Sequence, residues 1–223
     1  MRGHMTAEPD TRSKSRSGDR IALWMLLVVA TVTGAVFLWT SSNYQQSSGA
    51  VSTHVDDQGH LHVLGVTLGV SSLTQTEDIL QSKSDVALFI YPEGQAKAGL
   101  KLEAFFPAIA DHTKVVVRLD LDDEHLQALA TRGTVPRLYP NQVARMNLAA
   151  DDVISVHDAI VSELTLIPNL KVSAENLKAR FGEPDRIVSM GEGRDQYEYD
   201  AIGLKAMISK EEPPELHFSN PQL

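Results

Sequence analysis

The longest uncharged run in the chain covers residues 21–40 and reads IALWMLLVVATVTGAVFLWT. At about 1.5 Å of rise per residue, a helix of this length spans roughly 30 Å, the thickness of a bilayer core. The run lacks the polar stripe of a helix that packs on a soluble domain. Trp24 and Trp39 lie near its two ends, where indole rings prefer the headgroup region. The sequence predicts one transmembrane helix with these tryptophans at the membrane interfaces.

The charges that flank this run predict its orientation. Five basic residues precede it: Arg2, Arg12, Lys14, Arg16 and Arg20. After the run no Lys or Arg occurs until Lys83. Cytoplasmic flanks carry the excess of basic residues, so residues 1–20 are predicted to be a cytoplasmic tail. The remainder would lie outside the cytoplasm, in the periplasm if the protein belongs to the inner membrane of a Gram-negative bacterium.

A cleaved signal peptide is the alternative interpretation of the same run. Signal peptides have apolar cores of about 7–15 residues that end close to a small-x-small cleavage site. Here the apolar core is longer, and the nearest such site, at residues 48–50, lies well downstream of it. The chain contains no Cys, which excludes a lipid-modified N-terminal cysteine and disulfides. These features favour an uncleaved anchor.

The part of the chain after residue 40 is acidic. It contains 15 basic and 26 acidic side chains, a formal charge of −11. This balance argues against a nucleic-acid partner and predicts repulsion from anionic lipid headgroups. Residues 41–62 are polar, rich in Ser, Gln and Gly, and without apolar periodicity. They are predicted to be a flexible linker that holds the domain away from the membrane.

Apolar periodicity and turn residues in the remainder predict an α+β domain. We expect two small modules, residues 63–150 and 151–223, each with helical segments packed on an antiparallel sheet. Helices are expected at 74–81, from Asp122 or Asp123 to about 131, at 149–153 and at 174–181. Strands are expected at 64–69, 86–91, 100–106, 114–121, 143–148, 159–167, 186–190, 196–199, 204–208 and 215–218. The element order helix, strand, turn, strand, strand occurs twice, at about 71–121 and 173–219, which is compatible with a duplication or with coincidence.

Two short segments carry a resemblance to known envelope modules. Residues 65–71, GVTLGVS, followed by a capped helix, resemble a G-x-x-x-G-x-[ST] helix entry, and residues 177–184, LKARFGEP, resemble a helix that ends at L-x-x-x-F-G-x-P. Both patterns are similar to those of SmpA/OmlA (BamE-like) and β-lactamase-inhibitor-like modules. The resemblance implies helices on a three-stranded antiparallel sheet and a role in binding other proteins. The chain departs from these families in its apolar N-terminal run and in the additional elements at 122–167.

Residues that could carry chemistry do not form a catalytic signature. His54, His60 and His62 with Asp56 and Asp57 could bind a metal, but a polar linker gives ligands no rigid support. The acidic run at 120–124 lacks the Gly of a calcium loop and fits a helix N-cap instead. No Gly-x-Ser-x-Gly sequence and no phosphate-binding Gly loop is present. We therefore predict no catalytic residue, no metal and no cofactor.

Aromatic residues on two predicted strands are the candidates for a partner surface. Phe105 and Phe106 are adjacent, so they point to opposite faces of their strand, whereas Tyr197 and Tyr199 share a face. An exposed aromatic on a sheet is a plausible binding anchor. The alternative is that helices or the other module cover these side chains.

The predicted function is that of a membrane-anchored extracytoplasmic protein-interaction or assembly factor of the bacterial cell envelope, without enzymatic activity. An anchor raises the local concentration of a binding domain near membrane partners. The alternative is an envelope enzyme or small-ligand-binding protein with a site between the two modules, which would require a concave pocket.

Overall fold

The structure is a computed structural model that describes residues 53–94, 98–109 and 112–221. These residues belong to one compact unit, residues 50–223. The predicted cytoplasmic tail, the predicted transmembrane helix and its residues Trp24 and Trp39 lie outside the described residues. Within the described part, no helix is both long enough and apolar enough to span a bilayer.

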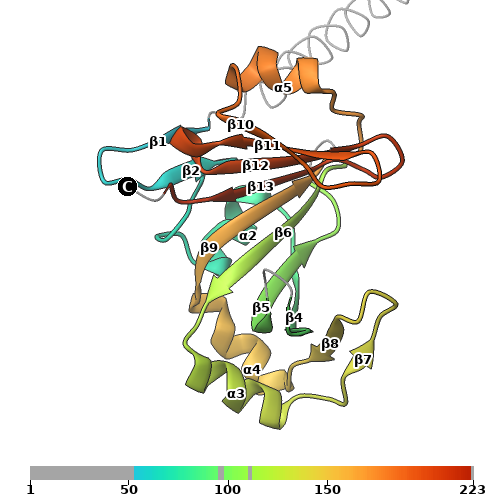
Figure 1. The fold of residues 1–223 in the computed structure, drawn as a ribbon. Helices are drawn as coiled ribbons and strands as arrows, with labels where there is room; N and C mark the ends of the chain where they lie inside the picture. The colour runs from blue at the N-terminus through green and yellow to red at the C-terminus, as the bar shows by residue number, and fades with distance from the viewer. Residues whose placement is uncertain (1–52, 95–97, 110–111, 222–223) are drawn as a thin grey trace, which may run out of the picture. The chain divides into compact units, whose positions relative to one another are not determined.

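Ten antiparallel strands form one sheet in the order β10-β11-β12-β13-β9-β6-β5-β4-β8-β7 (Figure 1). The strands are β4 (Asp85–Tyr91), β5 (Gly99–Phe106), β6 (Lys114–Asp120), β7 (Arg137–Leu138), β8 (Ala144–Asn147), β9 (Ile160–Ile167), β10 (Arg186–Ser189), β11 (Arg194–Tyr199), β12 (Leu204–Ser209) and β13 (Glu215–Ser219). A bulge between Arg118 and Leu119 shifts the register of β6 against β9. The sheet therefore connects the early and late parts of the sequence through the β6–β9 and β9–β13 pairs.

Within the described residues, a smaller antiparallel sheet and four α-helices complete the fold. The sheet contains β1 (His54–Val55), β2 (Leu61–Val63) and β3 (Val66–Thr67). The helices are α2 (Leu73–Leu80), α3 (Asp123–Arg132), α4 (Ala150–Ser155) and α5 (Ala174–Phe181), with 3-10 turns at Val156–Asp158 and Asp200–Ile202. Ser72 and Ser173 each form a capping box, with Gln75 and Asn176 respectively, so local sequence determines where α2 and α5 begin.

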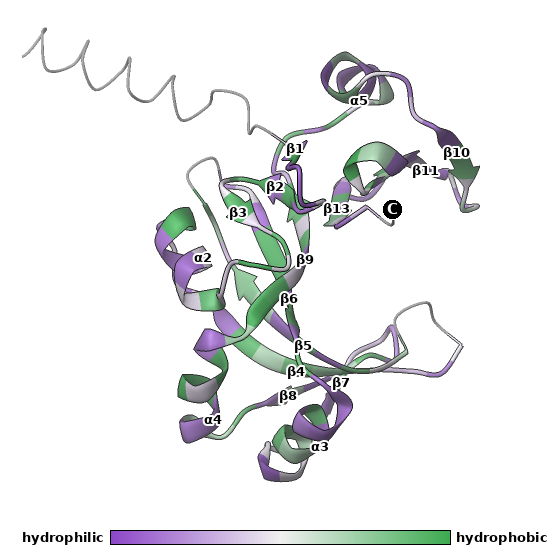
Figure 2. Ribbon diagram, turned by 90° about the vertical axis from the view of Figure 1, so that its left-hand side faces the viewer, coloured by the Kyte–Doolittle hydropathy of each residue, from purple (hydrophilic) through white to green (hydrophobic). Residues whose placement is uncertain are grey.

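The large sheet has two chemically different faces. Alternate residues of its strands, such as Leu102, Val117 and Leu164, are fully buried in one apolar core. The helices supply Leu73, Leu126, Leu129 and Leu177 to the same core. We call this side of the sheet the covered face. None of the described helices packs on the other side, which we call the open face; Figure 2 shows α2 and α4 on the same side of β9 and β6.

The structure differs from the expected domain boundaries in two places. The predicted linker extended to residue 62, but β1 and β2 begin within it and the Leu61 side chain is fully buried. The Leu61 N–H also donates to Asn220 Oδ1 at 2.8 Å, which joins this segment to the end of the chain. The predicted boundary at residue 150 falls inside one continuous sheet, because β9 pairs with β6 on one side and with β13 on the other. An α+β fold with antiparallel sheets is confirmed.

Candidate functional site

The predicted aromatic partner surface divides between the core and the two faces. Phe106 is fully buried and Tyr199 is 4% exposed, so neither side chain can contact a partner in the folded domain. Tyr199 packs against Phe181 of α5, with ring centroids 5.8 Å apart. Tyr197 shares the covered face with Tyr199 and is half-buried there. Phe105 is half-buried on the open face, as the alternation of a strand requires.

The histidines near the start of the described chain come together in the small sheet. The rings of His54 and His62 stack at 4.5 Å between centroids. Asp56 Oδ2 lies 3.1 Å from His62 Nε2 and 3.5 Å from His60 Nδ1. The backbone N–H of His60, with weaker contributions from His62 and Gln58, lowers the pKa of Asp56 to about 2. No group of three or more residues in the described part is arranged to bind a metal ion.

The acidic run at residues 120–124 caps a helix. Asp122 is the N-cap of α3, and its Oδ1 accepts from the His125 backbone N–H at 2.8 Å. Asp123 and Glu124 lie in the first helical turn, where carboxylates stabilise the positive end of the helix. These contacts account for the cluster of acidic side chains without a bound cation.

The open face carries a row of charged side chains that crosses seven strands. The register places Glu103 opposite Arg118 and Arg118 opposite Glu163. Farther along, it places Lys205 opposite His217, Glu198 opposite Lys205 and Arg186 opposite Glu198. We call this row the charged row; its members are Glu103, Arg118, Glu163, His217, Lys205, Glu198 and Arg186. Opposite charges on neighbouring strands stabilise a sheet, and here they also give the open face an ordered charge pattern.

Hydrogen bonds hold the centre of the charged row in place. Arg118 Nη1 donates to Glu163 Oε1 at 2.6 Å, and His217 Nε2 lies 3.5 Å from Glu163 Oε2. The other ring nitrogen of His217 lies 3.0 Å from the Thr165 hydroxyl. All these groups are part-buried, so their geometry is more restricted than that of fully exposed ion pairs.

A tyrosine extends this network toward β4. The Tyr91 hydroxyl donates to Glu103 Oε1 at 2.9 Å. Burial, followed by the charge and the hydrogen bond of Glu103, raises the pKa of Tyr91 well above its usual range. The phenol is therefore a permanent donor at physiological pH and orients the Glu103 carboxylate.

The far end of the charged row is a second ion-pair cluster. Arg186 donates to Glu198 Oε2 from Nε at 2.8 Å and from Nη2 at 2.7 Å, and to Asp200 at 3.1 Å. The hydrogen bonds from Arg186, together with one from Gln196, lower the pKa of the nearly buried Glu198. Glu198 is therefore an anion throughout the neutral pH range.

The open face carries slightly more basic than acidic side chains, although residues 41–223 have a formal charge of −11. By register, its strands contribute eight Lys or Arg and six Asp or Glu. The basic members are Lys101, Lys114, Arg118, Arg137, Arg145, Arg186, Arg194 and Lys205, and the acidic members are Asp85, Glu103, Asp120, Glu163, Glu198 and Glu215. The excess negative charge consequently lies elsewhere on the domain.

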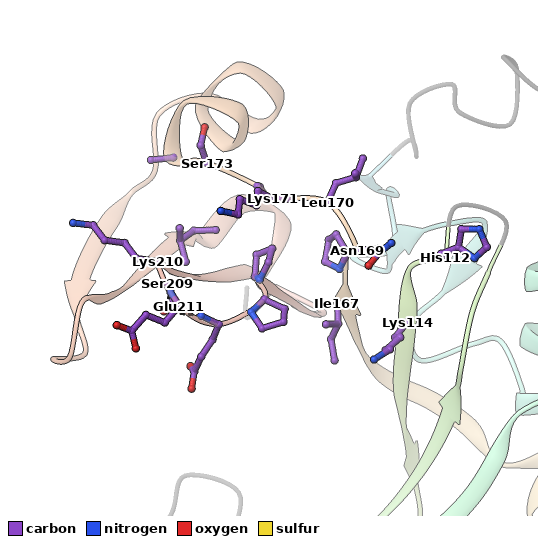
Figure 3. Close-up of a pocket in the computed structure, with 17 residues that line it drawn as sticks. His112, Lys114, Ile167, Asn169, Leu170, Lys171, Ser173, Ser209, Lys210 and Glu211 are labelled. Carbon is purple, nitrogen blue, oxygen red and sulfur yellow. Dashed lines mark hydrogen bonds between the residues drawn. The ribbon is translucent and has the colours of Figure 1, made fainter.

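Two hollows border the open face. The larger has a volume of about 600 Å³ and lies where β9 and β12 end and β6 begins. Figure 3 shows Lys114 and Ile167 on the strands, Lys171 and Ser173 on the connection to α5, and Ser209 to Glu211 on the β12–β13 hairpin. The other, of about 510 Å³, includes Glu163, Arg186, Lys205 and Ser219 and therefore adjoins the charged row.

Sequence reasoning missed the charged row because its members are far apart in the sequence. A signal was nevertheless present: each strand alternates apolar and polar residues, and the polar positions carry the charges. The strand order, which places Arg118 beside Glu163, could not be read from that alternation. The hollow near Lys114 likewise depends on loops from three parts of the chain.

Comparisons with known proteins give little further information. No family model and no curated protein matches the sequence. Among solved structures, a DUF4309 family protein (YjgB) from Bacillus subtilis is similar at 10% identity over 73% of this chain and 88% of that chain, with a TM-score of 0.37. A likeness of this degree supports no statement about the function of this chain.

Proposed function

We propose that this chain is a membrane-anchored, extracytoplasmic protein-interaction or assembly factor of the bacterial cell envelope. In this proposal residues 21–40 anchor the chain in the inner membrane with the N-terminus in the cytoplasm. The domain lies in the periplasm and binds an envelope protein without catalysing a reaction. The resemblance of residues 65–71 and 177–184 to BamE-like and β-lactamase-inhibitor-like modules points to the same class of function.

The open face is the observation that carries this proposal. It extends across the sheet, is half-buried rather than fully solvated at most positions, and presents the charged row in fixed geometry. An ordered row of acidic and basic side chains favours a partner with a complementary pattern and disfavours others. Because the open face has no excess of negative charge, an acidic domain can still approach an acidic envelope protein through it.

Site-specific photo-crosslinking in the native host tests the binding face. A photo-reactive amino acid replaces Lys205 or Met207, which project from the open face, in the full-length protein. Matched controls carry it at Val70 or Gln81, which are exposed and lie away from that face. The proposal requires one envelope protein to be captured from both open-face positions and not from the controls. Lys205→Glu should reduce its capture from position 207, and equal capture at all four positions would refute the assignment.

Membrane fractionation and protease protection test the location. Full-length protein should sediment with membranes, resist extraction by carbonate, and expose residues 53–221 to protease only after the outer membrane is opened. A chain lacking residues 1–40 should be absent from the membrane fraction. Recovery of the full-length chain in the soluble fraction would refute the anchor.

The hollow near Lys114 supports a second candidate function, the binding of a small anionic molecule. Lys114 and Lys171 line it and form no salt bridge with any described residue, and Ile167, Ile208 and Val172 provide apolar walls. A volume of about 600 Å³ falls in the range of small-molecule sites. Fluorescence of 8-anilinonaphthalene-1-sulfonate should rise on addition of the folded protein and should fall for Lys171→Ala but not for Lys101→Ala. Equal fluorescence of the two variants would exclude this hollow as the site.

A further inference from the structure

The two edges of the large sheet are not equivalent. At one edge, β7 has only two residues, one of them Arg137, and Pro136 and Pro140 flank it closely. Short, charged and proline-flanked edges resist pairing with another strand. At the other edge, β10 has four residues, all exposed, and Ile187-Val188-Ser189 carries no charge. The β10 edge also contains one charged residue, Arg186, and follows Pro184, but it is longer and more apolar than the β7 edge and therefore less protected against strand addition.

Apolar side chains are concentrated along this edge. Ile187 is 54% exposed, Val188 38% and Met190 48%. Consecutive exposed apolar residues on an edge strand are typical of a surface that another strand covers. None of the described elements lies against the free side of β10.

The hydrogen bonds of β10 show which backbone groups are free. Met190 N–H donates to Arg194 O at 2.9 Å. In an antiparallel pair the bonded positions alternate, so residues 186, 188 and 190 direct their backbone groups toward β11. Ile187 and Ser189 consequently direct their N–H and C=O groups away from the sheet.

We propose that β10 pairs antiparallel with β10 of a second copy of this chain. The two-fold axis passes beside Val188, so that Ile187 of each copy lies opposite Ser189 of the other. This register forms four backbone hydrogen bonds between the copies. It joins two ten-stranded sheets into one continuous sheet of twenty strands, with both open faces on the same side. The surface offered to a partner is thereby doubled, and the pairing itself does not depend on the proposed function.

Side-chain chemistry selects this register. Val188 meets Val188 of the second copy on the open face, and Arg186 lies opposite Met190. Glu192 lies in the β10–β11 turn, so an acidic side chain of one copy follows the position that lies opposite Arg186 of the other. No like charges face each other. The pairing of one four-residue strand buries less than the roughly 1,200 Å² of a stable interface, so the dimer should be weak and concentration-dependent.

Disulfide trapping in the full-length protein tests the pairing, because the natural chain contains no cysteine. Val188 pairs with itself at a non-hydrogen-bonded site, where the Cα atoms lie about 4.5 Å apart, within the range that a disulfide spans. Val188→Cys in native membranes should give a dimer under mild oxidation. Leu138→Cys, on the β7 edge and 69% exposed, is the collision control and should give at least about fivefold less.

A second substitution separates strand pairing from chance proximity. Ser189→Pro, introduced with Val188→Cys, removes an outward N–H and leaves the bonds to β11 in place. It should abolish the crosslink, whereas Ser189→Ala should retain it, and circular dichroism should show both variants to be folded. If Ser189→Pro unfolds the protein, Ser189→Lys replaces it and should reduce the crosslink by placing a charge at the apolar edge.

Three results would overturn the proposal. They are equal crosslinking at residues 188 and 138, a crosslink that survives Ser189→Pro in folded protein, and capture of a different protein at residue 188. The last would show that the edge accepts a foreign strand. Loss of partner capture at residues 205 and 207 with the 188 crosslink intact would instead refute only the proposed function.

Discussion

Glu77 and Ser84 are joined by two hydrogen bonds across the connection between α2 and β4. Glu77 Oε1 accepts from the Ser84 backbone N–H at 3.0 Å and from the Ser84 hydroxyl at 2.8 Å. Lys83 Nζ donates to the other carboxylate oxygen at 2.7 Å. Burial alone would raise the pKa of Glu77, but these donors more than offset it and lower the pKa. The buried carboxylate therefore ties the helix to the first strand of the large sheet.

Replacement of Glu77 by Ala should lower the free energy of unfolding by about 2–3 kcal/mol, because it leaves the part-buried Ser84 N–H without its acceptor. Glu77→Gln keeps an acceptor and should cost about 1 kcal/mol. Lys83→Ala removes an ammonium whose side chain is 84% exposed, so it should change the free energy of unfolding much less than Glu77→Ala does. Urea unfolding measures all three. Equal losses for Glu77→Ala and Lys83→Ala would show that the ion pair, rather than the Ser84 contact, stabilises the connection.

Gly203 should be intolerant of any side chain. It precedes β12 with φ +53°, and a Cβ built on it would overlap the carbonyl oxygen of Ser219. Gly203→Ala should therefore cost about 3 kcal/mol or more through backbone displacement at the β12–β13 pair. Gly193 also has positive φ, but its Cβ would meet nothing, so Gly193→Ala should cost only about 1 kcal/mol. Similar melting temperatures for Gly203→Ala and Gly193→Ala would contradict the close approach of Gly203 to the Ser219 carbonyl oxygen.

Local sequence signals located most of the helices and strands. The predicted helix at 174–181 has the observed bounds, and the strands predicted at 114–121 and 159–167 differ from β6 and β9 by one residue. Capping residues and strong apolar alternation explain this agreement. Both stretches with repeated element order fold as a helix followed by an antiparallel meander, α2-β4-β5-β6 and α5-β10-β11-β12.

Long-range pairing could not be read in the same way. The segment before residue 63 contains few apolar residues, yet Leu61 is buried in the core and Asn220, 159 residues away, binds its backbone N–H. The single sheet depends on β9 pairing with both β6 and β13, a choice that alternation does not encode. Alternation along one strand predicts that Phe105 and Phe106 face opposite sides of the sheet. It does not predict which side the helices leave uncovered, because that depends on contacts between distant segments.

Leu61 tests whether residues 53–63 belong to the folded domain. Leu61→Ala should lower the free energy of unfolding by about 2–4 kcal/mol, because the side chain is fully buried in the core. Gln58→Ala, at an exposed turn position of the same segment, should change it by less than about 0.5 kcal/mol. Differential scanning calorimetry of the full-length chain gives both values. If Leu61→Ala left the free energy of unfolding unchanged, residues 53–63 would belong to the linker and not to the folded domain.

Phe106 and Phe105 test which side of β5 forms the core. Phe106→Ala should cost about 3–5 kcal/mol, because it leaves a cavity beneath a fully buried ring. Phe105→Ala, on the open face, should cost less than half as much. If the open face binds a partner, Phe105→Ala should also weaken capture at residue 207, while a conservative change at the buried position, Phe106→Leu, should leave capture unchanged. If Phe105→Ala destabilised the protein more than Phe106→Ala, the covered and open faces of β5 would be the reverse of those assigned.

Stability should fall in acid because several carboxylates, among them Glu198, Asp152 and Glu77, have lowered pKa values in the folded state. Hydrogen bonds from Arg186 lower the pKa of Glu198, and those from Arg132 lower that of Asp152; Glu77 is lowered by Lys83 and Ser84 against the opposing effect of burial. Each group binds its proton more tightly in the unfolded chain, so its stabilising contribution is complete above the unfolded pKa, about 4–4.5. That contribution disappears as the pH falls through the lower folded pKa.

The free energy of unfolding should thus be level above about pH 5.5 and decline steadily below pH 4.5. Glu198→Gln should flatten this decline relative to Glu192→Gln, a change at an exposed turn carboxylate. If the free energy of unfolding rose between pH 5 and pH 3, the pH dependence would have the opposite sign, and these ion pairs could not be its cause.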